Sequence, residues 1–353
     1  MRGLAVAALI GGTLSCSGGH ASGRTATGPA DGDAAGGAVA GGAAGAVAPG
    51  TRCEASRLLV PSCGAWWGIA PGVFTRTPTG RALRDAERRM GRRSAILHVY
   101  HRGAELFPTA EEIALAREGR LLFVNWKPSL RHTWASVAAG ALDGRIARLA
   151  RHLRASFRER FFLTIHHEPE NDVRGGGNGA DDYRRMFRHV VTRLRGHGVT
   201  NAVTVMTYMG AVNWGAKPWF GRLYPGDDVV DWIALDPYAD GRVDDFAALV
   251  NRRRREFPGW PGFYRWAARH HPGKPLMVGE WGVFERPRDP GFKRRFYASV
   301  RRQAPAFSRI KALVYFESPR APRGDTRFDT TPGGLAEFRR LAASPHFTAP
   351  KLP

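Results

Sequence analysis

The chain has 353 residues, of which 53 are lysine or arginine and 31 are aspartate or glutamate, so its formal net charge is +22. Only six of the basic residues are lysine. An arginine excess of this kind indicates codon bias more than selection for nucleic-acid binding, and no basic-aromatic recognition module accompanies it. We therefore expect no nucleic-acid partner.

The first 16 residues resemble an export signal. Residues 3–14 are small and apolar, and 12 positions are too few to span a bilayer but fit the hydrophobic region of a secretory signal. The following Ser15-Cys16 resembles the end of a bacterial lipoprotein signal. We expect residues 1–16 to be a signal peptide, Cys16 to be lipidated, and the protein to be secreted or held on the outer face of the membrane. Ordinary cleavage that discards Cys16 is the alternative.

Residues 17–50 consist mostly of Gly, Ala, Ser, Thr and Val and contain no aromatic residue. Such a segment cannot bury enough surface to offset the entropy of the chain. We predict a flexible linker over 17–50 that is followed by one folded domain over 51–353. About 300 residues without an internal linker are typical of a barrel with long loops.

Cys53 and Cys63 precede the first predicted strand and are ten positions apart. In an exported chain this spacing predicts a disulfide that closes the entry loop. A metal site would need more ligands than these two residues offer.

Strand-like and helix-like patterns then alternate along the chain. Short apolar runs predict eight strands, at 66–70, 95–100, 121–125, 161–166, 202–207, 229–235, 275–279 and 312–316. Amphipathic patterns predict helices at 81–90, 111–117, 146–156, 183–194, 246–257, 292–302 and 335–341. Eight alternations predict an α/β fold of the (β/α)8, or TIM-barrel, type. A doubly wound sheet would have fewer strands and a Gly-rich turn after its first strand, whereas the Gly cluster at 175–180 lies past its strand and predicts a loop at the barrel mouth.

Two of the predicted strands end in a glutamate. Glu168 follows the run 161–166, and Glu280 follows the run 275–279, 112 positions later. At about 35 residues per βα unit, Glu280 lies three strands after Glu168, at the same face of the barrel. Two carboxylates at one barrel mouth are the minimum that a retaining glycosidase requires. Each glutamate alone would be read as a surface charge at a strand end.

Other polar and aromatic residues recur at the same strand ends, and this recurrence favours a carbohydrate site. Each aromatic residue alone would be read as core. The residues are His98, Tyr100, His101, Trp126, Lys127, His167, Tyr208, Asp236, Tyr238, Trp281 and Glu317. His166 and His167 are adjacent and point to opposite faces of a strand, so they cannot form one metal site. The sequence implies no metal and no cofactor.

Residues from about 63 to 341 resemble the family 26 glycoside hydrolases, which are mostly β-mannanases on a (β/α)8 barrel. The matching motifs are His167-Glu168, Asp236-Pro237-Tyr238 and Glu280-Trp281-Gly282, in the family's order. The resemblance implies that Glu168 is the acid/base, that Glu280 is the nucleophile, and that Tyr238 hydrogen-bonds Glu280. The recurrence at the strand ends, together with these motifs, assigns a larger set to the substrate-binding surface of the catalytic domain: His167, Tyr238, Asp236, Trp281, Trp126, Tyr208, His101 and Tyr100.

The chain departs from the family directly after Glu168. Family members commonly continue with Met-Asn-Gly and a Trp, whereas this chain reads Pro169-Glu170-Asn171-Asp172-Val173. The resemblance implies a β-glycanase, with β-1,4-mannan as the first substrate and β-glucan or xylan next. We expect a monomer. The alternative is a non-catalytic surface protein that uses the barrel to bind polysaccharide.

Overall fold

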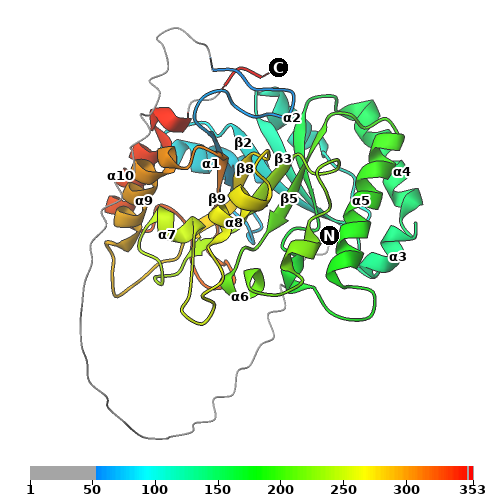
Figure 1. Ribbon diagram of the computed structural model, residues 1–353. Helices are drawn as coiled ribbons and strands as arrows, with labels where there is room; N and C mark the ends of the chain where they lie inside the picture. Colours follow the sequence, from blue (N-terminus) through cyan, green and yellow to red (C-terminus); the bar gives the residue numbers. More distant parts are fainter. Residues whose placement is uncertain (1–52, 348–349, 353) are drawn as a thin grey trace, which may run out of the picture. The chain divides into compact units, whose positions relative to one another are not determined.

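The computed structural model describes residues 53–347 and 350–352, so the predicted signal peptide with Cys16 and the predicted linker over 17–50 lie outside the described residues. In the described part, eight parallel strands form a closed barrel (Figure 1). Strands one to six pair in chain order, β9 pairs with β1, and a pairing between β6 and β8 closes the ring. The predicted (β/α)8 fold is confirmed. The barrel strands are β1 (Trp66–Ala70), β2 (Ile96–Arg102), β3 (Leu121–Lys127), β4 (Phe161–Ile165), β5 (Ala202–Tyr208), β6 (Trp232–Leu235), β8 (Leu276–Val283) and β9 (Ile310–Phe316).

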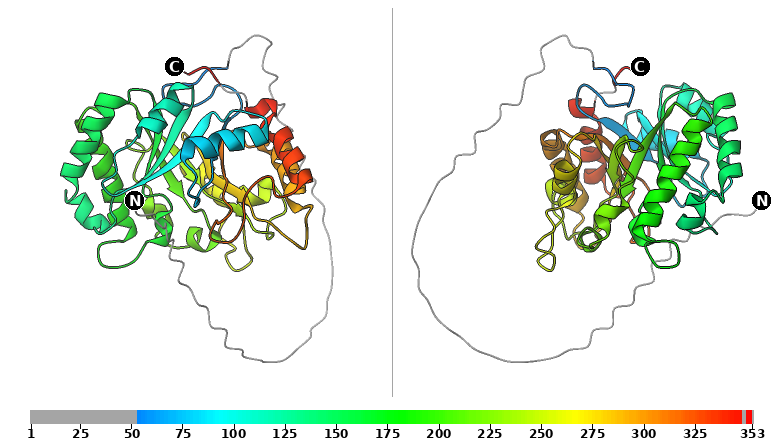
Figure 2. Two further views of the ribbon diagram at one scale, coloured as in Figure 1. Left: turned by 180° about the vertical axis from the view of Figure 1, so that it is seen from behind. Right: turned by 45° about the vertical axis from the view of Figure 1, so that its right-hand side comes forward.

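A short ninth strand, β7 (Tyr238–Ala239), extends the sheet beyond the ring by pairing with β8 at Gly282 and Val283. Helices surround the barrel, and α9 and α10 lie side by side on one flank (Figures 1 and 2). The helices are α1 (Thr79–Met90), α2 (Ala110–Arg117), α3 (Trp134–Ala138), α4 (Asp143–Ser156), α5 (Ala180–Gly196), α6 (Val212–Gly215), α7 (Phe246–Val250), α8 (Phe263–His270), α9 (Phe292–Gln303) and α10 (Pro332–Ala342). Among the described residues, none of these helices has the length and apolar character that crossing a membrane requires.

The helix predicted over 246–257 is wrong in its second half. The structure ends α7 at Val250, and Arg252 to Arg255 lie in the loop that follows. Four consecutive arginines would bring like charges together on a helix surface, which disfavours its continuation. A separate helix, α8, then covers this side of the barrel. The sequence patterns also missed the short helices α3 and α6.

Two apolar layers hold the fold together, and both follow from the alternation of side chains along a strand. Every second strand residue, such as Phe123, Phe162 and Trp232, packs inside the barrel. The intervening residues, such as Val124 and Leu163, pack between the barrel and the helices. Because both layers are buried, the strands read as continuous apolar runs, and polar residues stand out where the runs end.

The two ends of the described chain lie together. Cys53 and Cys63 form the predicted disulfide, with their Cα atoms 5.5 Å apart. The backbone N–H of Lys351 donates to the carbonyl of Cys53 at 2.9 Å, and that of Ala55 donates back to Lys351 at 3.0 Å. The entry segment is therefore tied both covalently and by backbone hydrogen bonds.

Candidate active site

Glu280 reaches the barrel mouth because β8 is irregular. Met277 faces the barrel interior and Val278 faces the helices, so a regular strand would turn Glu280 outward. The register with β9 shifts between Val278 and Trp281, where Gly279 and Glu280 of β8 lie opposite one residue of β9, Val314. Such a bulge re-aims side chains, and bulges are frequent beside active sites. Here it turns Glu280 inward.

Gly279 is the residue that this arrangement requires. A Cβ atom at position 279 would lie 2.8 Å from Oδ1 of Asp236, which is closer than real Cβ contacts come. Glycine therefore lets the carboxylate of Asp236, at the exit of β6, approach β8 directly beside Glu280.

Two tyrosine hydroxyls hold the carboxylate of Glu280. Tyr100 from β2 donates to Oε1 at 2.7 Å, and Tyr238 from β7 donates to Oε2 at 2.7 Å. The hydrogen bond from Tyr238 that the resemblance implied is thus present. Burial raises the pKa of Glu280, and the two hydroxyls oppose this rise by stabilising the ionised form. Both oxygens are fixed in position, and the side chain is only 5% exposed.

Glu168 is presented by a very different backbone. β4 ends at Ile165, and both His166 and Glu168 then adopt left-handed conformations, with φ of 55° and 50°. Non-glycine residues rarely adopt this region, and it is found at functional sites where surrounding contacts enforce it. The backbone N–H of Glu168 donates to the carbonyl of Thr207 at 3.0 Å, and the amide of Asn171 donates to its carboxylate at 3.1 Å.

His166 is buried beneath this loop and stabilises it. Trp134 donates its indole N–H to Nδ1 of His166 at 3.2 Å, so Nδ1 must accept, and the ring proton lies on Nε2. Nε2 faces Oδ2 of Asp172 at 2.8 Å, and that oxygen also accepts from Lys127 at 2.7 Å. Burial lowers the pKa of His166 to about 4, and hydrogen bonding to His166 holds the pKa of Asp172 well below its usual range.

His167 also remains neutral. Burial lowers its pKa to about 3, with the charges of His166 and Lys127 acting in the same direction. A neutral imidazole can donate or accept a hydrogen bond at the mouth without adding a positive charge beside Glu168.

The loop and the strand bring three carboxylates together. Glu168, Asp236 and Glu280 each contribute one carboxylate oxygen to a group in which all distances are within 4.8 Å. Burial and the negative charge of Glu280 raise the pKa of Glu168 and of Asp236 well above their usual range. Three carboxylates this close cannot all be ionised, so Glu280 takes the charge that its tyrosines stabilise and protons remain on its neighbours.

The same three residues are the metal-capable group among the described residues, because carboxylate oxygens bind hard divalent cations. In this structure the hydroxyls of Tyr100 and Tyr238 donate hydrogen bonds to the carboxylate of Glu280. The arrangement offers an ionised carboxylate beside protonated ones, which suits acid/base and nucleophilic chemistry.

No family model matches the chain. Endoglucanase H of Acetivibrio thermocellus is 25% identical over 294 residues, which cover 78% of this chain and 30% of that protein. A β-1,3-xylanase of Vibrio sp. is 28% identical over 116 residues, which cover 31% of this chain and 21% of the xylanase. The chain thus corresponds to less than a third of the length of either relative.

Solved structures match over most of the barrel. The family 26 domain of an endo-β-mannanase/endo-β-glucanase from Prevotella bryantii matches with a TM-score of 0.56 and 13% identity, over 82% of this chain and 92% of that one. A family 26 β-mannanase from Bacteroides ovatus matches with a TM-score of 0.54 and 16% identity, over 81% and 90%. The chain has the fold of the family 26 glycoside hydrolases.

Within this fold, three aromatic residues that the strand-end pattern assigned to substrate binding do not reach the mouth, which corrects that assignment. Trp126, Tyr208 and Trp281 are fully buried in the layer between the barrel and the helices. Trp126 and Tyr208 each follow an inward-facing residue by one position and so point outward. The bulge in β8 does the same to Trp281, whose ring packs edge-on against Tyr315.

His101 is also corrected. It follows the inward-facing Tyr100 by one position, and its Nε2 hydrogen-bonds Oε1 of Glu112 on α2 at 2.9 Å. Its role is therefore to join β2 to α2. Of the residues that the sequence placed in the site, the structure brings together Glu168, Glu280, Asp236, Tyr238, Tyr100 and His167.

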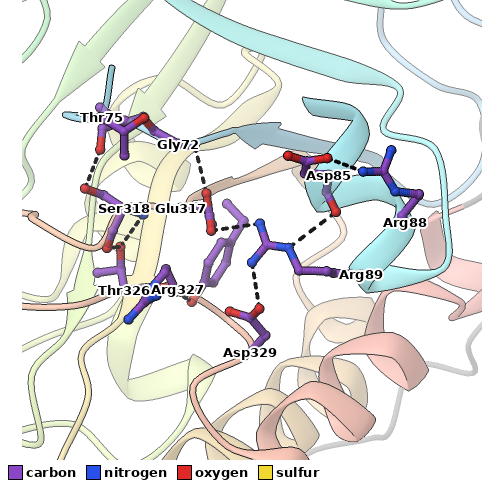
Figure 3. Close-up of polar contacts among 12 residues, drawn as sticks. Gly72, Thr75, Asp85, Arg88, Arg89, Glu317, Ser318, Thr326, Arg327 and Asp329 are labelled. Atoms are coloured by element: carbon purple, nitrogen blue, oxygen red, sulfur yellow. Dashed lines mark hydrogen bonds and ion pairs between the residues drawn. The ribbon is translucent and has the colours of Figure 1, made fainter. Parts of the chain in front are cut away.

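Glu317, at the exit of β9, forms a structural contact instead of joining the carboxylates (Figure 3). Its Oε2 accepts from the backbone N–H of Gly72 at 2.7 Å, and its Oε1 accepts from Arg89 at 3.2 Å. Arg89 also donates to Asp329 at 2.7 Å. This network ties the loop after β1, helix α1 and the segment after β9 together, and both oxygens of Glu317 take part in it.

Glu170, Asn171 and Asp172 also shape the site, although none of them was predicted as a site residue. Their signal was available as a run of polar residues directly after Glu168, where the chain departs from the family. Glu170 is 1% exposed, and its carboxylate accepts from the backbone N–H groups of Met209 and Gly210, each at 3.2 Å. This contact fastens the loop of Glu168 to the exit of β5.

Proposed function

We propose that the chain is a retaining glycoside hydrolase of the family 26 type that cleaves β-linked polysaccharide, with Glu168 as acid/base and Glu280 as nucleophile. The observation that carries the proposal is the approach of their carboxylate oxygens to within 4.8 Å. Retaining enzymes hold the two carboxyl groups about 5–5.5 Å apart, whereas inverting enzymes leave about 6.5–9.5 Å for a water molecule.

The two environments suit the two roles. Glu280 is ionised by two hydroxyl donors, and its oxygens are fixed, so one of them can attack the anomeric carbon as the glycosidic bond breaks. Glu168 retains its proton, because burial and nearby carboxylates raise its pKa, and gives that proton to the departing oxygen. In the second step Glu168 accepts a proton from water, which attacks the glycosyl ester on Glu280 and releases the sugar with its configuration kept.

The substrate is less narrowly defined than the reaction. Mannan is the first candidate, because the matched structures are described as mannanases. A β-glucan or xylan is the second, because the related sequences are an endoglucanase and a β-1,3-xylanase and because this chain lacks the family's usual residues after Glu168. A non-catalytic polysaccharide-binding barrel is the alternative from another class, although binding alone would not require this carboxylate set.

The test is turnover of mannan, mixed-linkage β-glucan, β-1,3-xylan and β-1,4-xylan, with the anomeric configuration of the first product followed by NMR. We expect one substrate to be cleaved with the β configuration retained. An α product would contradict the retaining mechanism, and binding without any product would favour the non-catalytic alternative.

We also propose that Cys16 is acylated and that the enzyme acts at the outer face of the membrane. Full-length protein should then sediment with membranes, and Cys16→Ala should release it to the medium. Wild-type protein found wholly in the medium would contradict the anchor.

A further inference from the structure

A basic groove lies on the flank of the barrel, among α7, α8 and the turn after α9. Its volume is about 560 Å³, and its walls come from the loop after β7, helix α7, the loop after α7, the start of α8 and the turn after α9. Four arginines line it, Arg242, Arg252, Arg253 and Arg265, against one carboxylate, Asp245. The arginine run that the sequence displayed at 252–255 therefore contributes to a hollow in the surface.

Two of these arginines have no ion-pair partner among the described residues. Arg242 and Arg252 form ion pairs with Asp240. Arg253 and Arg265 are exposed and make no ion pair with any residue that the structure describes. Asp245 forms no ion pair with either of them in the described part of the chain, and its Oδ1 caps α7 by accepting from the N–H of Ala248 at 2.8 Å. The groove thus presents guanidinium groups to whatever enters it.

A neighbouring cavity shows that the arginine-rich composition of the chain does not by itself produce an excess of arginines over carboxylates. It measures about 450 Å³ and shares Asp245 with the groove. Its three arginines, Arg294, Arg295 and Arg302, are matched by three carboxylates, including Glu337. The same arginine-rich chain therefore builds one balanced cavity and one cationic groove.

The walls of the groove are fixed in place. Gly262 has φ of 96°, and a Cβ atom there would lie 2.6 Å from Cα of Asn251, so the two segments pack backbone to backbone. The side chain of Asn251 accepts from the N–H of Arg265 at 3.0 Å and so caps the first turn of α8. Tyr264 packs edge-on against Phe307 across the groove floor, with ring centroids 4.9 Å apart. The arginines therefore project from a preformed scaffold.

Asp240 links the groove to the loops at the ends of the barrel strands. This carboxylate accepts from Arg242 and Arg252 and also from Arg323, at 3.2 Å. Arg323 is half-exposed and lies in the loop after β9, on the side of the barrel where the strands end. Asp240 itself follows Tyr238, which bonds Glu280, by two residues. Three guanidinium groups thus gather around one carboxylate, between the segment that carries Tyr238 and the groove.

We propose that this groove is a binding subsite for an acidic polysaccharide, whose carboxylate or phosphate groups pair with Arg253 and Arg265 while the β-linked chain enters the mouth. Arginine suits this task, because its planar fork of donors matches carboxylate and phosphate oxygens. The inference rests on the proposed function in one respect, namely that the ligand is a polysaccharide.

The test compares two derivatives of one glucan backbone, the anionic carboxymethyl cellulose and the neutral hydroxyethyl cellulose. Affinity is measured by calorimetry with the full chain in 0.15 M salt, where long-range attraction from the net charge is screened. Glu280→Gln is present in every sample so that no glycan is cut. The groove variant carries Arg253→Gln and Arg265→Gln. The matched control carries Arg151→Gln and Arg158→Gln, which remove two exposed guanidinium groups from the α4 side of the barrel.

We expect the groove variant to lose about fivefold or more in affinity for carboxymethyl cellulose, as two exposed ion pairs imply, and the control to change by less than about twofold. Affinity for hydroxyethyl cellulose should not change in either variant. Equal losses in the groove variant and the control would overturn the proposal, because they would show attraction to net charge alone. Binding to vesicles of phosphatidylcholine and phosphatidylglycerol that depends on Arg253 and Arg265, without binding to carboxymethyl cellulose, would overturn it in favour of a lipid surface.

Failure of the groove and failure of the proposed function give different results. A wild type that cleaves neutral glycan, and whose groove variant binds the anionic polymer unchanged, is a glycosidase without this subsite. A wild type that cleaves no glycan but binds the anionic polymer through Arg253 and Arg265 has the subsite without the activity.

Discussion

Glu280 and Glu168 face each other across the barrel mouth, but the chain positions them in different ways. Glu280 belongs to a strand, is almost fully buried, and has a hydroxyl donor on each oxygen. Glu168 belongs to a loop in a left-handed conformation, is partly exposed, and receives one side-chain hydrogen bond, from Asn171. A group that must attack from a fixed position needs the first environment. A group that must gain and lose a proton needs the second, with access to water.

The largest expected effect comes from deleting either carboxylate. Glu280→Ala removes the covalent step and should abolish measurable turnover of every substrate. Glu168→Ala should lose about 10²–10⁴-fold on polysaccharide, because a positioned acid contributes about that much, but far less on aryl glycosides with good leaving groups. Azide added to Glu168→Ala should restore turnover and give a β-glycosyl azide, which NMR identifies.

The opposite pattern would exchange the two roles. If Glu168→Ala with azide gave an α-glycosyl azide, Glu168 would be the nucleophile and Glu280 would be the acid/base. Thermal melts of both variants are the control, since a variant that is unfolded would lose activity for another reason.

An intermediate effect is expected from the hydroxyls that separate the two environments. Tyr238→Phe or Tyr100→Phe removes one hydrogen bond to the ionised Glu280, which is worth about 1.5–3 kcal/mol. One pKa unit corresponds to about 1.4 kcal/mol, so the pKa of Glu280 should rise by about one to two units. Since Glu280 must be ionised to attack, the acidic limb of the kcat/KM profile should move to higher pH by that amount.

Tyr224→Phe provides the matched control, because this hydroxyl bonds Asp227, outside the mouth. Its pH profile should superimpose on that of the wild type. An acidic limb that stays in place in both Tyr238→Phe and Tyr100→Phe would mean that the hydroxyls do not set the ionisation of Glu280.

The sequence predicted the barrel well because buried parallel strands read as apolar runs, and all eight runs correspond to observed strands. It placed Glu168, Glu280 and Asp236 correctly at the mouth because each follows such a run. It misplaced Trp126 and Tyr208, although the alternation of side chains along each strand was available to assign them to the outer layer. A position at a strand end shows that a residue lies at the mouth end of the barrel. Only its place in the alternation shows whether its side chain faces the barrel interior or the helices.

Other features had no local signal. The residues around Gly279 do not predict a bulge. Without the bulge, Glu280 would face the helices and Trp281 would face the barrel interior. The left-handed His166 and Glu168 depend on contacts from three other elements, including the carbonyl of Thr207 and the side chain of Trp134. These features arise from tertiary contacts, so a single sequence without its neighbours in space could not predict them.

The smallest expected effect tests whether the loop itself tunes Glu168. Glu170 lies two residues further on, and burial raises its pKa from 4.5 to about 7, although the N–H groups of Met209 and Gly210 oppose the rise. The ionisable groups that respond to its charge are Glu168, Asp236, Tyr183 on α5 and Tyr208 on β5. Ionised Glu170 helps Glu168 to keep its proton. Glu170→Gln should therefore lower the pKa of Glu168 and move the basic limb of kcat/KM to lower pH.

The same substitution should change how stability depends on pH, with a sign that follows from linkage. Between pH 4.5 and about 7 the folded protein holds a proton on Glu170 that the unfolded chain releases, so this group makes the free energy of unfolding fall as pH rises, by about 3 kcal/mol over the window. Glu170→Gln should remove that part of the slope, whereas Glu256→Gln, at an exposed site, should leave both the slope and the basic limb unchanged. A flattened stability curve with an unmoved basic limb would mean that Glu170 fastens the loop without tuning Glu168. If neither changes, the difference between the two glutamates must arise from the strand and its tyrosines alone.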